Sequence, residues 1–227
     1  MIQLLPNVKI KINSGFFIKD PESSEIGKLI VNNSIELIGT IGSVNFSIKK
    51  LSVFMKCPES TIYRYFTNKL MIVQYLSSYY WGSLEYQIIL QTKNIRSPKD
   101  KLKRLISILV GPSFAISGSF INEDKLQKII HTEVFYLNHL RCDNKSKENL
   151  YHQSYNRIID MGADFITSIA PKYVFPHMLI VNVIAGIRQQ KYFKQNFQVL
   201  SGKNNAELNL ELFFYHMVCH TIQENTN

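Results

Sequence analysis

Apolar residues recur at helical spacing along most of the chain after residue 23. The first run consists of Ile26, Leu29, Ile30, Leu37, Ile38 and Ile41. Ser23 or Ser24 is placed to cap the start of this run, and Gly42 stands at its C-terminal end. The pattern predicts a long amphipathic helix between these residues.

Two shorter helices are predicted next. Ser47 caps the first of them. Its inner face is made of Ile48, Leu51, Ser52 and Met55. The segment Lys56–Pro58 breaks the helix, because proline is tolerated only in the first turn of a helix. The second short helix runs from about Glu59 to Tyr65, and Asn68 caps the long helix that follows.

The remaining pattern is also helical. Later helices are predicted at about residues 98–111, 123–141, 145–170, 174–196 and 206–223. Residues 7–13 alternate between apolar and polar side chains, but this extended stretch is too short and isolated to form a sheet. We interpret residues 1–21 as an arm that lies against the first helices. The whole pattern predicts an all-α protein with about nine helices.

Positive charge is concentrated around the two short helices. The 227-residue chain has a net charge of +9, with 45% hydrophobic and 19% charged residues, which suits one packed domain or a small domain joined to a larger one. Five cations and one acid between residues 47 and 69 give a local net charge of +4: Lys49, Lys50, Lys56, Arg64, Lys69 and Glu59. This concentration permits a polyanionic partner.

The cysteines and the apolar runs indicate in which cellular compartment the protein is found. Cys57, Cys142 and Cys219 are odd in number and widely spaced, which argues against a disulfide framework and favours a reducing cytosol. The N-terminus has no apolar run of signal-peptide length. Residues 174–187 are too short and too interrupted to span a bilayer, so we expect a buried helix there. These features predict a soluble cytoplasmic protein without membrane association.

Residues 60–69, with the sequence STIYRYFTNK, combine aromatic, cationic and hydroxyl side chains. Ile62 and Phe66 are four residues apart and are predicted to face inward. The other side chains suit a surface that meets a polyanion, because cations supply charge and hydroxyls bond phosphate oxygens. Two short helices about three residues apart, the second polar and basic, match the helix-turn-helix layout, whose second helix lies in the DNA major groove.

The residues around this motif resemble the DNA-binding domain of TetR-family transcriptional regulators over residues 24–72. The resemblance rests on Ile30, Leu37, Ile38, Gly42, Ser47, Leu51, the run Thr61–Phe66, Asn68 and Lys69. It implies a helix-turn-helix domain of three helices over residues 1–69, followed by a helical bundle over residues 70–227 that dimerises and binds an effector. The later residues match the family only in length and helical character.

By position, the resemblance implies two kinds of DNA contact. The residues implied to contact phosphates are Ser47, Thr61, Tyr63 and Lys69. The residues implied to face base edges are Lys49, Glu59, Ser60 and Arg64. An arginine can bond a guanine edge, and a glutamate can accept a hydrogen bond from a cytosine amino group.

The chain departs from the family pattern near the turn. Lys56 stands where the family usually has glycine, and a left-handed backbone there would cost lysine about 1 kcal/mol. Val53 and Phe54 lie where polar residues are common. Phe16 and Phe17 of the arm are candidates to cover them.

An aromatic group on the long helix has two interpretations. Its members are Tyr79, Tyr80, Trp81 and Tyr86. They either line an effector pocket or pack beneath the DNA-binding head, because pockets and cores share this composition. His216 and His220 lie one helical turn apart, a spacing that can chelate a metal. We predict no metal there, because two ligands make no site without a third and the surrounding segment is apolar.

The last two helices are apolar on more than one face. On the final helix, one side consists of Leu208, Leu212, Tyr215 and Ile222. The other side, which is the candidate dimer interface, consists of Leu210, Phe214, Met217 and Thr221. One face can serve the core and the other a second subunit, which predicts a homodimer.

The sequence therefore predicts a one-component transcriptional regulator, which in such a family is usually a repressor. It would bind double-stranded operator DNA as a homodimer and respond to an apolar or amphipathic small molecule. No catalytic arrangement or phosphate loop is recognisable, so we expect no enzyme and no cofactor. The alternatives are an α-helical small-molecule-binding protein with a degenerate DNA-binding head, and an enzyme that uses the C-terminal cavity.

Overall fold

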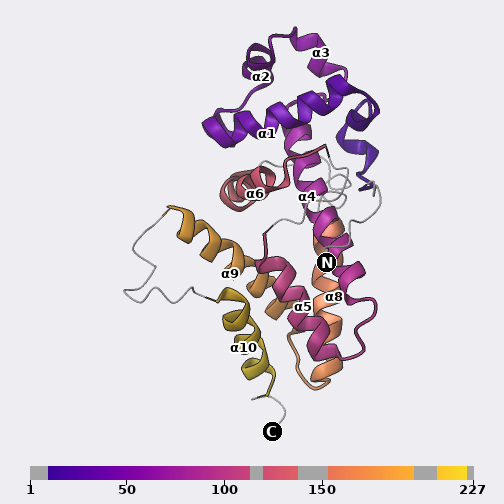
Figure 1. Ribbon diagram of the computed structural model, residues 1–227, viewed down its shortest axis with the longest axis vertical. Helices are drawn as coiled ribbons and strands as arrows, with labels where there is room; N and C mark the ends of the chain where they lie inside the picture. The colour runs from indigo at the N-terminus through magenta and orange to yellow at the C-terminus, as the bar shows by residue number, and fades with distance from the viewer. Residues whose placement is uncertain (1–9, 113–119, 138–152, 197–208, 224–227) are drawn as a thin grey trace, which may run out of the picture. The chain divides into compact units, whose positions relative to one another are not determined.

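The computed structural model describes residues 10–112, 120–137, 153–196 and 209–223 (Figure 1). Within these residues all regular structure is helical, as predicted. The nine α-helices are α1 (Glu25–Asn45), α2 (Ile48–Met55), α3 (Glu59–Tyr63), α4 (Lys69–Thr92), α5 (Pro98–Val110), α6 (Glu123–Leu137), α8 (Gln153–Ile169), α9 (Pro176–Asn196) and α10 (Leu210–Gln223). Two 3-10 helices, η1 (Ser14–Phe16) and η2 (Pro21–Ser23), belong to the N-terminal arm. Predicted helix ends between 138 and 152, and between 197 and 208, lie outside the described residues.

The chain forms two compact units. The first contains residues 1–83 and 113–153, and the second contains residues 84–112 and 154–227. The helix α4 contributes residues to both units, and α6 belongs to the first unit although it follows α5 in the chain. The functional boundary expected near residue 69 remains a prediction.

Local sequence signals determine the shape of α1. The Ser24 hydroxyl accepts a hydrogen bond from the Gly27 N–H at 3.3 Å, as expected of an N-cap. Gly27 has no room for a side chain, because a Cβ there would lie 2.4 Å from the Pro21 carbonyl oxygen. Gly42 has a φ of 77°, a conformation that favours glycine. It kinks the helix rather than ending it, and α1 continues to Asn45.

The described part of the N-terminal arm, residues 10–21, lies against the first helices, as predicted, whereas residues 1–9 lie outside the described residues. Phe16 is 1% exposed, and the Phe17 ring meets the Tyr75 ring edge-on with centroids 6.1 Å apart. The Ile18 N–H donates to the Tyr65 carbonyl at 2.7 Å. The arm therefore contacts the residues just after α3 through Tyr65 and contacts α4 through the buried Tyr75.

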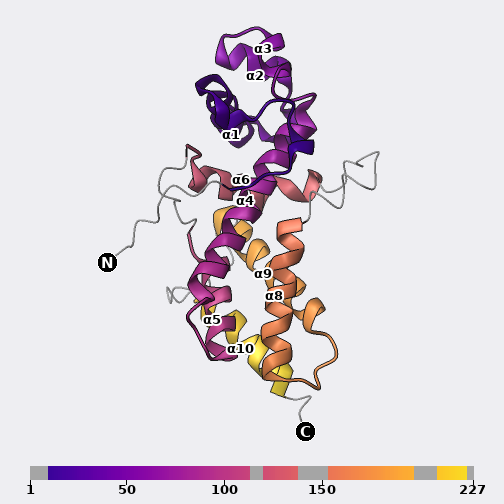
Figure 2. The ribbon, with the colours of Figure 1, turned by 90° about the vertical axis from the view of Figure 1, so that its right-hand side faces the viewer.

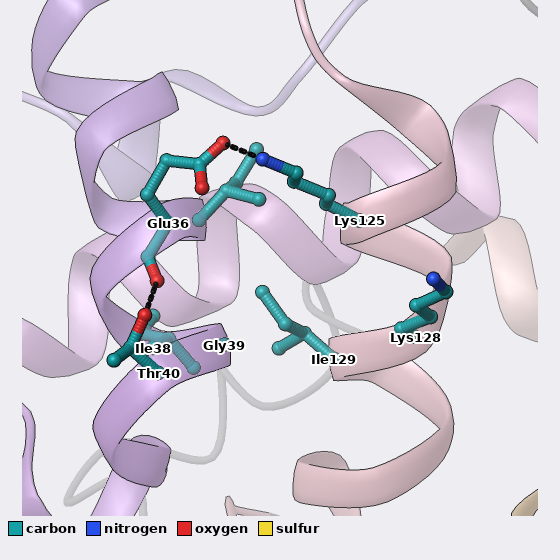
Figure 3. Close-up of a pocket in the computed structure, with 8 residues that line it drawn as sticks. Glu36, Ile38, Gly39, Thr40, Lys125, Lys128 and Ile129 are labelled. Carbon is teal, nitrogen blue, oxygen red and sulfur yellow. Dashed lines mark hydrogen bonds and ion pairs between the residues drawn. The ribbon is translucent and has the colours of Figure 1, made fainter. Parts of the chain in front are cut away.

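Within the first unit, α6 packs against α1, as the two views of the ribbon show (Figures 1 and 2). The Asn32 side-chain amide donates to the Phe120 carbonyl at 2.6 Å. Lys125 of α6 forms an ion pair with Glu36 of α1 at 2.6 Å (Figure 3). Helix α1, the first helix of the predicted DNA-binding head (residues 1–69), is thus joined to α6 by both apolar and polar contacts.

In the second unit, α10 packs against α5 and α9. The inward side of α5 consists of Leu102, Leu105, Ile106 and Leu109. Two glycines allow close helix contacts. A Cβ on Gly162 of α8 would lie 2.8 Å from Ile180 of α9, and a Cβ on Gly186 of α9 would lie 2.8 Å from the Phe214 ring of α10.

Lys191 of α9 lies at the C-terminal end of α5. Its Nζ donates to the carbonyls of Leu109 at 3.1 Å and Gly111 at 3.0 Å. A cation is favoured there, because carbonyls at the end of a helix carry partial negative charge. Burial nevertheless lowers the pKa of Lys191 to about 8.

The apolar stretch at residues 174–187 continues into α9, as predicted, but only one face of it is buried. The buried residues are Leu179, Ile180, Val183, Ile184 and Ile187. The exposed apolar residues are Val174, Phe175, Met178 and Val181. Among the described residues, no helix has both the length and the hydropathy needed to cross a membrane.

Candidate nucleic-acid interface

A left-handed residue joins the two short helices α2 and α3. Lys56 has φ 53° and ψ 42°, and it is the one described residue other than glycine with a positive φ. Its N–H donates to the Val53 carbonyl at 3.1 Å, and the Cys57 N–H donates to the Ser52 carbonyl at 3.0 Å. These bonds close the end of α2. The turn that favours glycine is therefore made by lysine, at a cost of about 1 kcal/mol.

Ser47 caps α2, as predicted. Its Oγ accepts a hydrogen bond from the Lys50 N–H at 3.2 Å. A hydroxyl that accepts a bond keeps its own proton for donation. Ser47 can therefore cap the helix and donate to an anion at the same time.

The side chains of α3 and of the residues directly after it divide into an inner and an outer set. Ile62 and Phe66 are fully buried, as predicted. Of the predicted DNA contacts between residues 59 and 64, the exposed ones are Ser60, Tyr63 and Arg64, and the half-buried ones are Glu59 and Thr61. Apart from the acidic Glu59, the outer set is polar or cationic, which fits a surface for a polyanion.

Tyr65 belongs to the inner set, although it lies in the same short segment as Tyr63. It is 2% exposed, and its hydroxyl is 2.7 Å from the Ser24 Oγ at the start of α1. The Lys19 ammonium lies 5.3 Å from the centre of the Tyr65 ring. Helix α3 ends at Tyr63 rather than at Tyr65, and the contacts of Tyr65 are with the arm and the start of α1. The sequence pattern did not distinguish the two tyrosines.

Lys69 begins α4, and its side chain reaches the end of α1. Its Nζ donates to the carbonyls of Phe46 at 3.2 Å and Val44 at 3.4 Å. Asn68 caps α4 as predicted, accepting from the Met71 N–H at 3.1 Å. An ammonium has three donors, so Lys69 keeps one for a further anion. The phosphate contact that the resemblance implies for Lys69 remains a prediction, and the sequence did not indicate the contact with α1.

The five cations between residues 47 and 69 have no ion pair among the described residues. Lys49, Lys50, Lys56 and Arg64 are exposed, and Lys69 is half-buried. The described ion pairs all involve other residues. The surface of α2, the turn and α3 therefore carries uncompensated positive charge. Lys50 and Lys56 belong to this surface, and the charge count of the segment was the signal that indicated them.

The arm does not cover the apolar residues of α2. Val53 is 72% exposed and Phe54 is 49% exposed. The expectation that Phe16 and Phe17 cover them is wrong, because Phe17 packs on Tyr75 and leaves these two side chains open to solvent.

The predicted effector residues on α4 are placed in different surroundings. Tyr79, Tyr80 and Trp81 are buried, whereas Tyr86 is half-buried and belongs to the second unit. The Tyr79 hydroxyl donates to Glu123 Oε1 at 3.5 Å, and the Tyr80 hydroxyl lies 3.3 Å from His131 Nε2. The Trp81 ring meets the Tyr80 ring edge-on at 5.1 Å. The structure thus brings Tyr79 and Tyr80 to polar side chains of α6, with Trp81 against Tyr80, and the effector role of all four aromatics remains a prediction.

The faces of α10 differ from the predicted division. Of the predicted interface residues, Leu210, Met217 and Thr221 are half-buried. Phe214 is 3% exposed and its ring lies against Gly186 of α9, so a second subunit cannot reach it. The accessible apolar residues are Leu212 and Phe213, at 50% and 55% exposure. They border an open hollow of about 590 Å³ together with Asn209, His216 and Met217.

The histidines of α10 are both exposed, with ring centres 6.2 Å apart. In the part of the chain that the structure describes, no group of three or more His, Cys, Asp or Glu side chains gathers into a metal site. Leu208, which was predicted to lie on this helix, is outside the described residues.

The fold is similar to that of solved regulator structures. A crystal structure of AibR in complex with isovaleryl coenzyme A and operator DNA matches with a TM-score of 0.59 and 14% identity, over 86% of this chain and 97% of that chain. Apo AibR matches with a TM-score of 0.53 and 13% identity, over 85% and 96%. The fatty acid degradation regulator FadR from Bacillus halodurans matches with a TM-score of 0.59 and 15% identity, over 86% and 95%.

At these identities the similarity shows the fold. No protein-family model and no curated protein matches the chain.

Proposed function

We propose that the chain is a DNA-binding transcriptional regulator whose operator affinity is controlled by a small molecule. The observation that carries this proposal is the row of cations without acidic partners along α2, the Lys56 turn and α3. Such a surface gains free energy from a polyanion, because phosphate contacts release counterions. The fold supports the proposal, since AibR shares it and has been crystallised with operator DNA.

The residues of this surface take two roles in the proposal. Ser47, Thr61, Tyr63 and Lys69 contact phosphates and orient the head on DNA. Lys49, Glu59, Ser60 and Arg64 face base edges in the major groove. The exposure of Ser60, Tyr63 and Arg64 leaves these side chains accessible to DNA.

The proposed regulator works as a homodimer, so that two heads meet two half-sites of one operator. The exposed apolar residues of α10, Leu212 and Phe213, are the candidate contacts with a second subunit. Phe214 is left out because it is buried in its own chain. Binding of an effector that prefers one arrangement of the heads then changes operator affinity, and we propose repression as the outcome.

The proposed effector is an apolar or amphipathic compound. The proposed regulator requires no cofactor. The aromatic group of α4 with Glu123 and His131 combines apolar side chains with a few polar atoms, a composition that ligand sites share. The isovaleryl coenzyme A bound by AibR makes acyl thioesters the first compounds to test. The protein acts in the cytoplasm in this proposal.

The decisive experiment selects genomic DNA fragments with the wild-type protein and then titrates a selected duplex and a scrambled duplex. Arg64→Ala is expected to lose about 1–3 kcal/mol on the selected duplex and to relax the preference at one base pair per half-site. Arg96→Ala is the matched control, because Arg96 is an exposed arginine outside the head. Equal affinity of Arg64→Ala and wild type, or no enrichment of any fragment, would overturn the proposal.

A further inference from the structure

Lys56, in the turn between α2 and α3, has a backbone conformation that suits glycine better than lysine. Its φ of 53° and ψ of 42° lie in the left-handed region. A Cβ crowds the backbone in that region, whereas glycine has no Cβ and adopts it freely. The other described residue with a positive φ is Gly42. The chain therefore uses glycine at one such position and carries the strain of a side chain at Lys56.

The turn does not need the lysine side chain for its own geometry. Backbone hydrogen bonds close it, since the Lys56 N–H donates to the Val53 carbonyl at 3.1 Å and the Cys57 N–H donates to the Ser52 carbonyl at 3.0 Å. Glycine at position 56 would form the same bonds without the crowding. The reason for a lysine must therefore lie in its side chain.

Within the described residues, no ion pair of the Lys56 side chain offsets the strain. The side chain is exposed, and the ion pairs of the described residues all involve other groups. Glu59, which is the acid nearest to Lys56 in the sequence, forms none of them. A strained residue whose charge has no partner in its own chain indicates a role in a complex.

The place of Lys56 in the head indicates which group it meets. It directly follows α2, whereas Ser47 caps the other end of that helix. The eight residues of α2 span roughly 12 Å. Successive phosphates of one DNA strand are about 3.4 Å apart along the helix axis, so groups at the two ends of α2 meet different phosphates. Between Ser47 and Lys56 the sequence has no acid, and Lys49 and Val53 are exposed.

We propose that Lys56 binds a DNA phosphate, in addition to the phosphate contacts assigned above, and that this contact offsets the strain of its backbone. The proposal rests on the proposed function, because it concerns the same DNA-binding surface. The strain is present in the free protein and in the complex, but the phosphate contact exists only in the complex. The chain thus gives up stability in the free state and gains affinity for DNA. A phosphate contact carries no sequence information.

The test replaces the lysine with glycine and measures stability and DNA binding of the full chain. Lys56→Gly should raise the midpoint of thermal unfolding by about 2–4 °C, because the strain is removed. It should also weaken binding to the selected duplex and the scrambled duplex alike, by at least about threefold. The salt dependence should become shallower by about one unit, because one fewer counterion is released. A purely structural role would leave the salt dependence unchanged.

Three further variants separate charge from strain. Lys56→Arg keeps both, so it should bind DNA within about twofold of wild type and unfold at the same temperature. Lys56→Asn removes the charge and tolerates the left-handed region, so it should behave as Lys56→Gly does. Lys93→Asn is the matched control, because Lys93 is an exposed lysine outside the head. It should leave the salt dependence of DNA binding unchanged.

A second measurement locates the phosphate. Each phosphate of the selected duplex is replaced in turn by a neutral methylphosphonate. At one position in each half-site the replacement should weaken binding of the wild type but not of Lys56→Gly, because the two changes remove the same contact. A scan in which every position weakens both proteins equally would contradict the contact.

The outcomes separate this proposal from the proposed function. If Arg64→Ala weakens binding to the selected duplex but Lys56→Gly keeps the salt dependence of wild type, the phosphate contact is wrong and the regulator stands. An unfolding temperature of Lys56→Gly at or below that of wild type overturns the strain, and this measurement needs no DNA. A wild type that binds no duplex overturns the proposed function and the phosphate contact together.

Discussion

The exposed sides of α3 and α10 have opposite chemistry. At α3, Tyr63 is 45% exposed beside the exposed Arg64. On α10, Leu212 and Phe213 are 50% and 55% exposed. A cationic surface is stable in water and gains from an anion, whereas adjacent apolar side chains gain from burial, at about 25 cal/mol per Å². The two surfaces therefore suit different partners, a nucleic acid in the first case and a second apolar surface in the other.

The largest effect that tests this comparison comes from two adjacent phenylalanines. Phe214→Ala should lower the free energy of unfolding by about 3–5 kcal/mol, because the buried ring fills the space over Gly186. Phe213→Ala, its matched control, should cost less than about 1 kcal/mol, because its ring is already exposed. Chemical denaturation measures both. Equal losses would show that α10 presents a different side to the core.

Lys191 tests the contrast between a buried cation and the exposed cations of the head. Its folded pKa is about 8, below the ordinary value near 10.4 in the unfolded chain. Between these two values the unfolded state binds more protons, so the wild type gains stability as the pH rises through that window. The gain is at most about 3 kcal/mol. Below pH 8 the cost of burying the charge is fully present.

The measurement compares unfolding free energies of wild type and Lys191→Met from pH 7 to 10.5. The difference should change in favour of wild type as the pH rises. Lys49→Met serves as the control, because Lys49 is exposed and its variant should run parallel to wild type. A Lys191→Met curve parallel to wild type would exclude a depressed pKa.

A third test concerns self-association through the exposed apolar side of α10. Phe213→Glu should weaken self-association by more than about 1 kcal/mol, because a carboxylate in an apolar interface loses hydration without a partner. Unfolding of the isolated subunit should change little, since the residue is exposed there. Sedimentation at several concentrations gives the result. A wild type that is monomeric at micromolar concentration would rule out the interface.

Two lysines of the head give the smallest effect. Lys69→Ala should make the salt dependence of DNA binding shallower by about one unit and lower stability by about 1 kcal/mol, because its Nζ also bonds Phe46 and Val44. Lys49→Ala should weaken DNA binding without lowering stability, because its side chain is exposed and lies on the outer face of α2. Loss of stability without a change in salt slope would assign Lys69 a purely structural role.

The head was predictable to near-residue detail because its elements carry local signals. Ser24, Ser47 and Asn68 cap helices where the sequence placed the caps. The inward side of Ile62 and Phe66 followed from their spacing. The exposure of the cations on this surface was also predictable from the sequence, because charged side chains are rarely buried.

The faces of α10 were not predictable, because apolar residues surround most of the helix. Spacing then identifies a helix but not its inner side, which depends on where α5 and α9 lie. Gly186 was the missing information, since its lack of a side chain admits the Phe214 ring. The role of Tyr65 was hidden for a similar reason. Its partner Ser24 is 41 residues away, and no local pattern joins them.

The hydroxyl pair of Tyr65 and Ser24 also has a consequence for the order of folding. The contacts of α2 with α3 join residues close in the chain, whereas this pair closes a loop of 41 residues. Closing a loop costs entropy that grows with its length. We therefore expect the pair to form after the folding transition state. Replacing Tyr65 with phenylalanine should then accelerate unfolding of the head while leaving its folding rate nearly unchanged.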